Sequence, residues 1–299
     1  MSISATTVQV RQIHDVFVGE VSGVDLRQPL DTESVAALED AINRYAVLVF
    51  HDQAISDEQQ MAFSRNFGDL ETTVRAYRKD FTPRLDVHMA DISNLNERNE
   101  VLAASDRRRL NALGNRLWHS DSSFKRIPAR FSLLSARAVP DEGGETEFAD
   151  MRAAWDALPA KMQQQLDGLI AEHTQLFSRA KIGFTDWSED ELAKMAPVPQ
   201  VLVRTHPGSG RKSLFMSSHA GRIRGMEEPE ARMLLLDLME HATQRAFVYT
   251  HRWRVGDLVM WDNRCTMHRA RAYDETQVRD MRRTTVSDGR PTVPDELAA

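Results

Sequence analysis

The first seventy residues alternate between apolar residues at helical spacing and a continuous apolar run typical of a buried strand. Apolar residues recur at helical spacing over 35–45, directly after Asp31, a favourable N-cap, so we expect a helix there. The uniformly apolar run AVLVF at 46–50 predicts a buried strand. A second helix is predicted to begin after Ser56, which has a glutamine three residues later as in a capping box, and to stop at Gly68.

After residue 130 the pattern changes to short β runs. Turn residues separate several of them, and only two helical stretches intervene, one capped by Asp150 and one over about 228–242. Many short strands with helices outside them favour a mainly β fold with peripheral helices, a jelly roll or sandwich. The strand-like runs are FSLLSARAV, VLVRTH, SLFMSS, FVYTHRW, DLVMW and RRTTV.

The organisation of the chain favours one domain over residues 1–299. It contains no internal repeat, low-complexity tract or Gly/Ser linker. Two polar connections, about 72–116 and 178–200, are long enough to be lids, and long connections in compact domains are often functional. The segment GSGRKS at 208–213 lacks the glycine spacing of a phosphate loop and is better interpreted as a hairpin turn.

Composition excludes several classes of protein. The 299 residues are 41% hydrophobic and 27% charged, as in an ordinary globular protein. No apolar run approaches the roughly 18 residues of a membrane helix, and the N-terminus does not resemble a secretory signal, so we expect a cytoplasmic protein. The single Cys265 excludes an internal disulfide and a Cys-rich zinc site. A net charge of −6 argues against a nucleic-acid partner, but a local basic pocket could still bind small anions.

The segment LWHSDSSF places His119 and Asp121 two residues apart. On an extended chain both side chains point to the same side and can reach one metal ion. Such a pair occurs about once by chance in a chain of this composition. For the pair alone, a half-buried histidine hydrogen-bonded to an aspartate is the more common explanation.

A third metal ligand near His119 and Asp121 would favour a metal site over a hydrogen-bonded pair. Two histidines and one carboxylate suit non-haem Fe(II), and His268 follows the predicted strand DLVMWDN. Cys265 lies three residues earlier and so points to the opposite side of an extended chain, which disfavours a Cys-x-x-His zinc site. Arg279 and Arg283 follow on one side of the next predicted strand, where guanidinium groups in a pocket would bind carboxylates.

At these residues the chain resembles the taurine dioxygenase and 2,4-dichlorophenoxyacetate dioxygenase family of Fe(II)/2-oxoglutarate enzymes, from about residue 16 to 286. The phrases ADISN, LWHSDSSF and TEFADMRAAWDALP are more similar to the phenoxyacetate branch than to the taurine branch. The other motifs that carry the resemblance are GVDLRQPL, YAVLVFHDQAISDEQQMAFSRNFG, GGETEFADMRAAWDALP, VRTHPGSGRKSLF, EHATQRAFVY and GDLVMWDNRCTMHRA.

The resemblance implies a double-stranded β-helix, a cupin-like jelly roll, with a core at 16–286 and a C-terminal tail at 288–299. It implies iron held by His119, Asp121 and His268. It also implies that Thr146 and Arg279 bind the distal carboxylate of 2-oxoglutarate. The prime substrate is expected at Arg283 and Asn115, and further candidate contacts are His219, His206 and Arg75.

The activity implied is hydroxylation of a small aryloxyalkanoate such as 2,4-dichlorophenoxyacetate with Fe(II), 2-oxoglutarate and O₂. The products would be a phenol, glyoxylate, succinate and CO₂, and no protein residue is needed as a general acid or base. Two alternatives remain: an alkylsulfonate dioxygenase of the taurine type, and a non-enzymatic jelly roll that binds a metal. The family often forms dimers or larger assemblies, so we expect a homo-oligomer.

Overall fold

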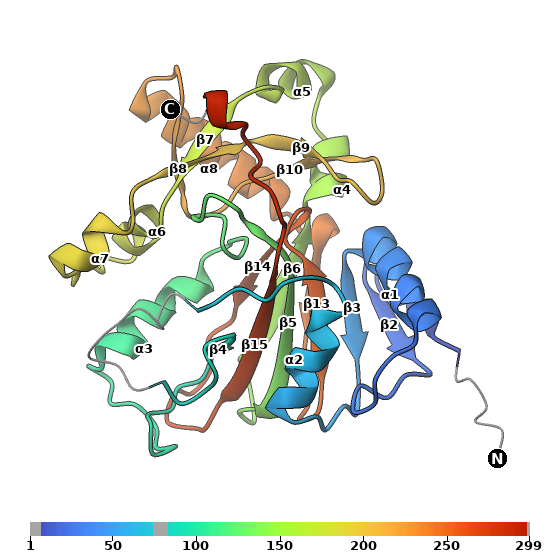
Figure 1. Cartoon of the computed structure of the whole chain (residues 1–299). Coiled ribbons are helices and arrows are strands. Elements are labelled where there is room, and N and C mark those ends of the chain that lie inside the picture. The colour runs from blue at the N-terminus through green and yellow to red at the C-terminus, as the bar shows by residue number, and fades with distance from the viewer. Residues whose placement is uncertain (1–6, 74–82, 298–299) are drawn as a thin grey trace, which may run out of the picture.

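The computed structural model describes residues 7–73 and 83–297. Its largest layer is a seven-stranded sheet in the order β1-β2-β3-β13-β5-β15-β4, which joins strands from both ends of the chain (Figure 1). Neighbouring strands are antiparallel except for β2 and β3, which are parallel. The strands are β1 (Gln9–Gln12), β2 (Gly19–Ser22), β3 (Val47–Phe50), β13 (Leu258–Asp262), β5 (Ala129–Ala138), β15 (Asp280–Ser287) and β4 (Met89–Asp91).

Two helices cover the outer face of the large sheet. Helix α1 (Thr32–Tyr45) begins after its N-cap Asp31, and α2 (Asp57–Arg65) begins after Ser56, whose capping box with Gln59 is formed. Apolar side chains of both helices pack with those of β3 and β13 in one buried cluster. The structure confirms both predicted helices and the buried strand between them.

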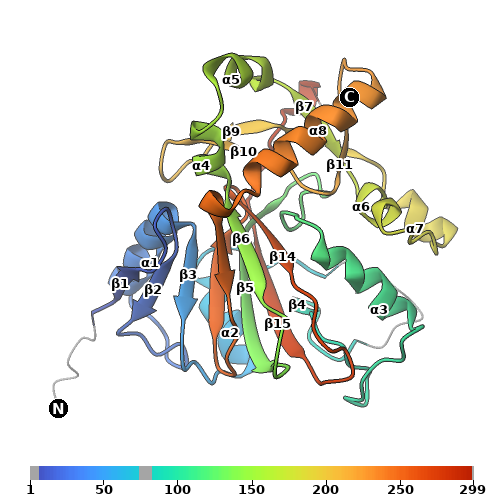
Figure 2. The ribbon, with the colours of Figure 1, turned by 180° about the vertical axis from the view of Figure 1, so that it is seen from behind.

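A three-stranded antiparallel sheet lies against the inner face of the large one. It contains β12 (Val248–His251), β6 (Thr146–Asp150) and β14 (Thr266–Ala270), with β6 in the middle. Phe148 of β6 packs with Trp261 of β13 in a shared buried cluster. Figure 2 views the molecule from this side, with β6 and β14 in front of the large sheet. The two facing sheets enclose the core on which the site described below is built.

The remaining strands lie beyond one end of these sheets, at the top of Figure 1. One group is a three-stranded sheet in the order β11-β7-β8, and the other is the hairpin β9-β10. Thr205 pairs with Lys212 in this hairpin, so the predicted hairpin is confirmed, although Lys212 and Ser213 already belong to strand β10 and the turn itself precedes them. The elements are β7 (Ile170–His173), β8 (Val198–Val201), β9 (Val203–Thr205), β10 (Lys212–Leu214), β11 (Ala220–Ile223), α4 (Met151–Asp156), α5 (Ala160–Leu166), α8 (Glu228–Ala242), η3 (Arg245–Phe247) and η4 (Asp295–Leu297).

The two long connections contain helices and meet each other. The first carries α3 and the second α7, and Arg107 of α3 pairs with Asp186 and Glu191 at 2.7 and 2.9 Å. With these short helices included, helices and strands contain similar fractions of the described residues. The protein is therefore a mixed α and β protein, and the expectation of a mainly β fold is corrected. The apolar patterns of the short helices are too short to stand out in sequence. The bounds are α3 (Arg107–Ala112), η2 (Leu113–Arg116), α6 (Gln175–Lys181) and α7 (Glu189–Ala193).

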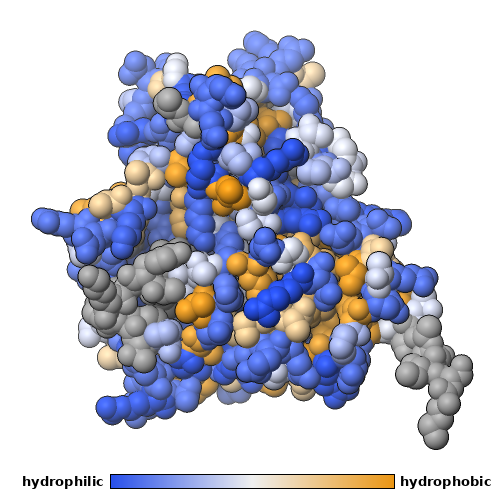
Figure 3. Space-filling view, viewed as in Figure 1, coloured by the Kyte–Doolittle hydropathy of each residue, from blue (hydrophilic) through white to orange (hydrophobic). Residues whose placement is uncertain are grey.

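Hydrophilic residues dominate the face of the molecule shown in Figure 3, with smaller hydrophobic patches mostly over the large sheet and its helices. Within residues 7–73 and 83–297, no helix has both the length and the apolar character needed to cross a membrane. The large apolar side chains are instead concentrated in three buried clusters between the layers.

Candidate metal and substrate site

His119, Asp121 and His268 converge beside the small sheet, where His119 forms an isolated β-bridge with His268 of β14. Backbone hydrogen bonds of 3.0 and 2.8 Å tie His119 to His268 of β14, and the two ring centroids are 4.2 Å apart. Asp121 Oδ1 lies 3.9 Å from His119 Nε2, and Asp121 Oδ2 lies 3.6 Å from His268 Nε2. One potential ligand atom from each residue lies within 4.8 Å of the others.

The hydrogen bonds of His119 suit a metal ligand. Its Nδ1 lies 2.7 Å from the Leu117 carbonyl oxygen, which can only accept. Nδ1 therefore carries the proton and Nε2 presents its lone pair to the site, the arrangement usual for metal-bound histidines. Burial lowers the pKa of both His119 and His268, so both imidazoles are neutral.

Asp121 supplies the negative charge of the site. Burial alone would raise the pKa of Asp121, but the positive charge of the Arg283 guanidinium group outweighs burial and lowers this pKa below its usual value. Ser132 Oγ donates to Asp121 Oδ2 at 2.7 Å, and the Asp121 backbone N–H donates to Asn263 Oδ1 at 3.0 Å. Two neutral imidazoles and one ionised carboxylate therefore fit a divalent transition metal such as Fe(II).

Ser132 and Asn263 were not predicted from the sequence. Asn263 Nδ2 also donates to Ser132 Oγ at 2.9 Å, so the two residues form one network around Asp121. Asn263 ends the motif DLVMWDN, where an asparagine after a buried strand is a usable signal. Ser132 lies within the apolar strand β5 and carries no such signal.

Thr146 shares a sheet face with His268. In the β6–β14 pair, Phe148 is opposite His268 and Thr146 is opposite Ala270, so Thr146 lies two residues further along, about 7 Å away. Arg279 reaches the same end of β6, because its Nη2 donates to the Gly144 carbonyl oxygen at 3.5 Å. The structure thus brings Thr146 and Arg279 close together beside the three ligands.

Arg279 is a buried cation, and the groups that its side chain contacts are not carboxylates. Its side chain donates to the Ile92 carbonyl oxygen at 3.0 Å and lies over the Tyr273 ring at 5.6 Å. No ion pair with an acidic side chain within 4.0 Å is found for it in residues 7–73 and 83–297. Burial lowers the pKa of Arg279. A carboxylate bound here would supply the charge that the protein itself leaves uncompensated.

A cavity of about 710 Å³ opens beside the three ligands. His119 and Asp121 line it, and so do three of the predicted substrate residues, Arg283, Asn115 and His219. Thr146 and Arg279 are not part of its lining. Its walls also include apolar side chains from the chain after Asp121 and from the second long connection, namely Phe124, Trp187, Met195, Ala196 and Val198.

Arg283 links the cavity to the metal ligands. Its Nη1 donates to Asp121 Oδ1, while its Nε is buried without a hydrogen-bond partner in the described part of the chain. The guanidinium group therefore has N–H groups left for a second anion. His219 contributes a buried neutral ring, since burial lowers its pKa well below the usual value, and its Nδ1 lies 2.9 Å from Ser178 Oγ.

Arg179 is a buried cavity residue that the sequence did not reveal. It projects from α6 and its guanidinium group packs against Gly114, where an added Cβ would lie 2.5 Å from the arginine Cζ. The signal for it is weak, because Arg179 and Gly114 are far apart in the sequence and neither belongs to a recognisable motif.

His206 lies away from the cavity, and this differs from its predicted role. It is completely buried, with Nε2 at 2.9 Å from Asp262 Oδ2 and Nδ1 at 2.9 Å from Ser209 Oγ. The sequence pattern indicates that His206 lies near the end of a strand. It does not indicate which layer of the fold the side chain enters. The remaining candidate, Arg75, lies outside the described residues.

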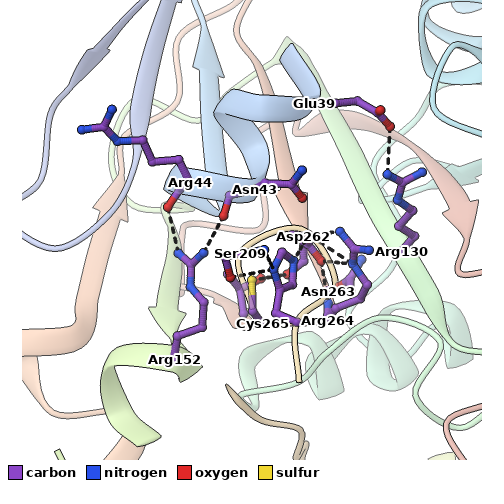
Figure 4. A network of polar contacts seen from close by, with 12 residues as sticks. Glu39, Asn43, Arg44, Arg130, Arg152, Ser209, Asp262, Asn263, Arg264 and Cys265 are labelled. Carbon is purple, nitrogen blue, oxygen red and sulfur yellow. Dashed lines mark hydrogen bonds and ion pairs between the residues drawn. The ribbon is translucent and has the colours of Figure 1, made fainter. Parts of the chain in front are cut away.

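His206, Asp262 and Cys265 form a second group with ligand atoms within 4.8 Å of one another. Arg264 already contacts both carboxylate oxygens of Asp262, at 2.9 and 2.6 Å, and Figure 4 shows these side chains beside Cys265. Burial raises the pKa of the Cys265 thiol, which therefore stays protonated and is a poor metal ligand. This group is a buried ion-pair network, and Cys265 belongs to it rather than to the site of His268.

Comparison with known proteins identifies the family to which the chain is similar. The model of the family "Taurine catabolism dioxygenase TauD, TfdA family" matches residues 9–285. The alpha-ketoglutarate-dependent 2,4-dichlorophenoxyacetate dioxygenase of Cupriavidus pinatubonensis is 48% identical over 282 residues, 94% of this chain and 98% of that protein. The (S)-phenoxypropionate/alpha-ketoglutarate-dioxygenase of Sphingobium herbicidovorans is 38% identical over 94% of this chain and 95% of its own length.

Among solved structures, the crystal structure of AAD-2 in complex with Mn(II) and N-oxalylglycine superposes with a TM-score of 0.90. It is 53% identical in sequence, and the match covers 97% of this chain and 100% of AAD-2. These findings confirm the resemblance inferred from the motifs. The chain belongs to the TauD/TfdA family of dioxygenases.

Proposed function

We propose that this protein is an Fe(II)- and 2-oxoglutarate-dependent dioxygenase that hydroxylates a small aryloxyalkanoate such as 2,4-dichlorophenoxyacetate. The observation that carries the proposal is the group of His119, Asp121 and His268, two of which, His119 and Asp121, line a cavity that Arg283 also lines. The likeness to 2,4-dichlorophenoxyacetate and (S)-phenoxypropionate dioxygenases supports this substrate class. The products are a phenol, glyoxylate, succinate and CO₂.

His119, Asp121 and His268 hold the iron in this proposal. With O₂ and 2-oxoglutarate, bound Fe(II) supplies the redox chemistry that couples oxidative decarboxylation to hydroxylation of a C–H bond. The protein contributes three ligands on one side and leaves the other side open to the cavity. Ser132 and Asn263 orient Asp121, so the carboxylate keeps its position when the site is filled.

Arg279 and Thr146 bind the distal carboxylate of 2-oxoglutarate. The offset of about 7 Å between Thr146 and His268 along the sheet is one that a five-carbon diacid can bridge. The guanidinium group of Arg279 pairs with the carboxylate through two charge-assisted hydrogen bonds. Binding then compensates a buried positive charge that has no carboxylate partner in the described chain.

Arg283, together with Asn115 and His219, binds the carboxylate of the prime substrate, and the apolar wall at Phe124 and Met195 takes the aryl ring. This orientation places the carbon next to the ether oxygen toward the metal, so that positioning selects the bond that reacts. The hydroxylated carbon is then a hemiacetal, which separates into phenol and glyoxylate without an acid or base from the protein.

We further propose that the two facing sheets form a double-stranded β-helix and that residues 1–299 make up a single catalytic domain with its core at about 16–286. The shared core of the two sheets and the superposition with AAD-2 over nearly the whole chain support this interpretation.

Succinate release by the iron-loaded protein tests the function with a panel of aryloxyacetates, aryloxypropionates and alkylsulfonates. Aryloxyalkanoates should raise succinate release well above the level without prime substrate. A preference for sulfonates would support the taurine-type alternative. No release with any compound, and no visible absorption band when 2-oxoglutarate is added to the anaerobic Fe(II) protein, would support a protein that only binds metal.

A further inference from the structure

The Thr146 hydroxyl group has a fixed hydrogen-bond direction. Trp253 Nε1 lies 3.0 Å from Thr146 Oγ1, and an indole N–H can only donate. Thr146 therefore accepts this bond with one lone pair and keeps its own proton. In the described part of the chain, no acceptor takes that proton.

The register of the small sheet brings Trp253 to Thr146. His251 of β12 is directly opposite Thr146 of β6, and Trp253 lies two residues after His251. Side chains at such diagonal positions of an antiparallel pair are within reach of each other when one of them is large. Trp253 itself lies just beyond β12, which ends at His251, so the end of this strand pair determines where the indole starts and its size lets it reach Thr146.

Trp253 is itself held in place by its neighbours. Its ring packs edge to face on His251 at a centroid distance of 4.6 Å. Asp257 fixes the residues on both sides, because Asp257 Oδ2 lies 3.0 Å from His251 Nε2 and accepts from the Arg254 backbone N–H at 3.0 Å. The Asp257 carboxylate is 1% exposed, so these bonds are shielded from water.

We propose that Trp253 is a positioning residue for 2-oxoglutarate, which it assists by forcing the Thr146 hydroxyl to donate to the distal carboxylate beside Arg279. This inference rests on the proposed function. A carboxylate only accepts hydrogen bonds, so only the rotamer of Thr146 that points its proton forward can bind it. The indole N–H selects that rotamer before the ligand arrives and strengthens the outgoing bond by polarising the hydroxyl.

Trp253→Phe removes the N–H and keeps an aromatic ring. Isothermal titration calorimetry of N-oxalylglycine against the Mn(II) protein should show binding weakened about tenfold, the upper end of what one neutral hydrogen bond contributes. In turnover, the KM for 2-oxoglutarate should rise by a similar factor, while kcat and the KM for the prime substrate stay within about twofold. Trp155→Phe, in the core on α4, is the matched control and should leave N-oxalylglycine affinity unchanged.

A double-mutant cycle with Thr146→Val separates positioning from a general structural role. If Trp253 acts through Thr146, Trp253→Phe has no further effect on affinity once the hydroxyl is gone. An undiminished tenfold loss in the Thr146→Val background would overturn the inference, and so would wild-type affinity in Trp253→Phe itself. Should Trp253→Phe fail to fold, Trp253→His offers a ring N–H and should retain most of the affinity, which Trp253→Leu should lose.

Failure of the proposed function gives a different result. In that case the wild-type Mn(II) protein does not bind N-oxalylglycine at all, and both proposals are wrong. Suppose instead that the wild-type protein binds N-oxalylglycine and that Thr146→Val weakens this binding but Trp253→Phe does not. Only the role of Trp253 is then refuted.

Discussion

Replacement of Arg279 by lysine or glutamine separates charge from geometry at the 2-oxoglutarate site. Lysine keeps the positive charge but has no planar fork, whereas glutamine keeps a donor and loses the charge. Arg279 is 5% exposed, and the only hydrogen-bond acceptors for its side chain in the described chain are two backbone carbonyl oxygens, Ile92 O and Gly144 O, so neither replacement breaks an ion pair within the described chain. We therefore expect a larger effect on ligand binding than on folding.

The magnitude follows from the two charge-assisted hydrogen bonds that a guanidinium group forms with a carboxylate. Each such bond contributes about 1.5–3 kcal/mol. Arg279→Lys removes one of them, which corresponds to about 10- to 150-fold weaker binding at 1.36 kcal/mol per factor of ten. Arg279→Gln removes the second charged contact as well and should weaken binding by more than about 150-fold.

Calorimetric titration of N-oxalylglycine into the Mn(II) protein measures both variants directly. The matched control is Arg269→Gln, on the strand of His268, where the arginine pairs with Glu147 at 2.6 Å on the outer side. It should bind like the wild type. Wild-type affinity in both Arg279 variants would refute the assignment, and equal losses in the Arg279 and Arg269 variants would show that the effect is not specific.

Three further changes test other parts of the account. Asp121→Ala should abolish tight Fe(II) binding and succinate release, seen by metal analysis after gel filtration, because it removes the only anionic ligand; retained stoichiometric iron would contradict the ligand set. Arg283→Gln should raise the KM for the aryloxyalkanoate at least tenfold and leave N-oxalylglycine affinity within about threefold; an unchanged KM would place the substrate carboxylate elsewhere. His173 is buried, both its ring nitrogens lack partners in the described chain, and burial lowers its pKa from 6.5 to about 3. Between those values only the unfolded chain binds the proton, so stability falls as pH drops, by about 2 kcal/mol from pH 7 to 5 at 1.36 kcal/mol per unit. Urea unfolding of His173→Leu should show that much less loss over this range, and an equal pH dependence in both proteins would refute the argument.

Local patterns in the sequence predicted the parts of the fold that local forces determine. The caps at Asp31 and Ser56 and the apolar run of β3 depend on residues a few positions apart, so they can be recognised without the structure. The short helices of the long connections were missed although α3 and α7 also begin at caps, Asp106 and Ser188. With six and five residues they are too short to show an apolar helical period, and contacts between them such as Arg107 with Glu191 help to stabilise them. The order of the strands in the large sheet depends on pairings between distant segments and was equally out of reach.

The same distinction applies to the site. His119 and Asp121 are close in sequence and form a recognisable pair, and the structure brings His268 to them. His206 shows what the sequence pattern cannot determine, because a residue at the end of β9 could enter either layer of the fold. Only the contact with Asp262, in a buried ion-pair network, places His206 in the interior. Arg179 contacts Gly114 across two separate connections, so no local pattern could reveal it.

The most direct test of the central claim is the ratio of products formed from 2,4-dichlorophenoxyacetate. The protein, loaded with Fe(II) and supplied with 2-oxoglutarate and O₂, should release 2,4-dichlorophenol and succinate in nearly equal amounts, and both should disappear in Asp121→Ala. Succinate without phenol, or no dependence of succinate release on the aryloxyacetate, would contradict the proposed activity.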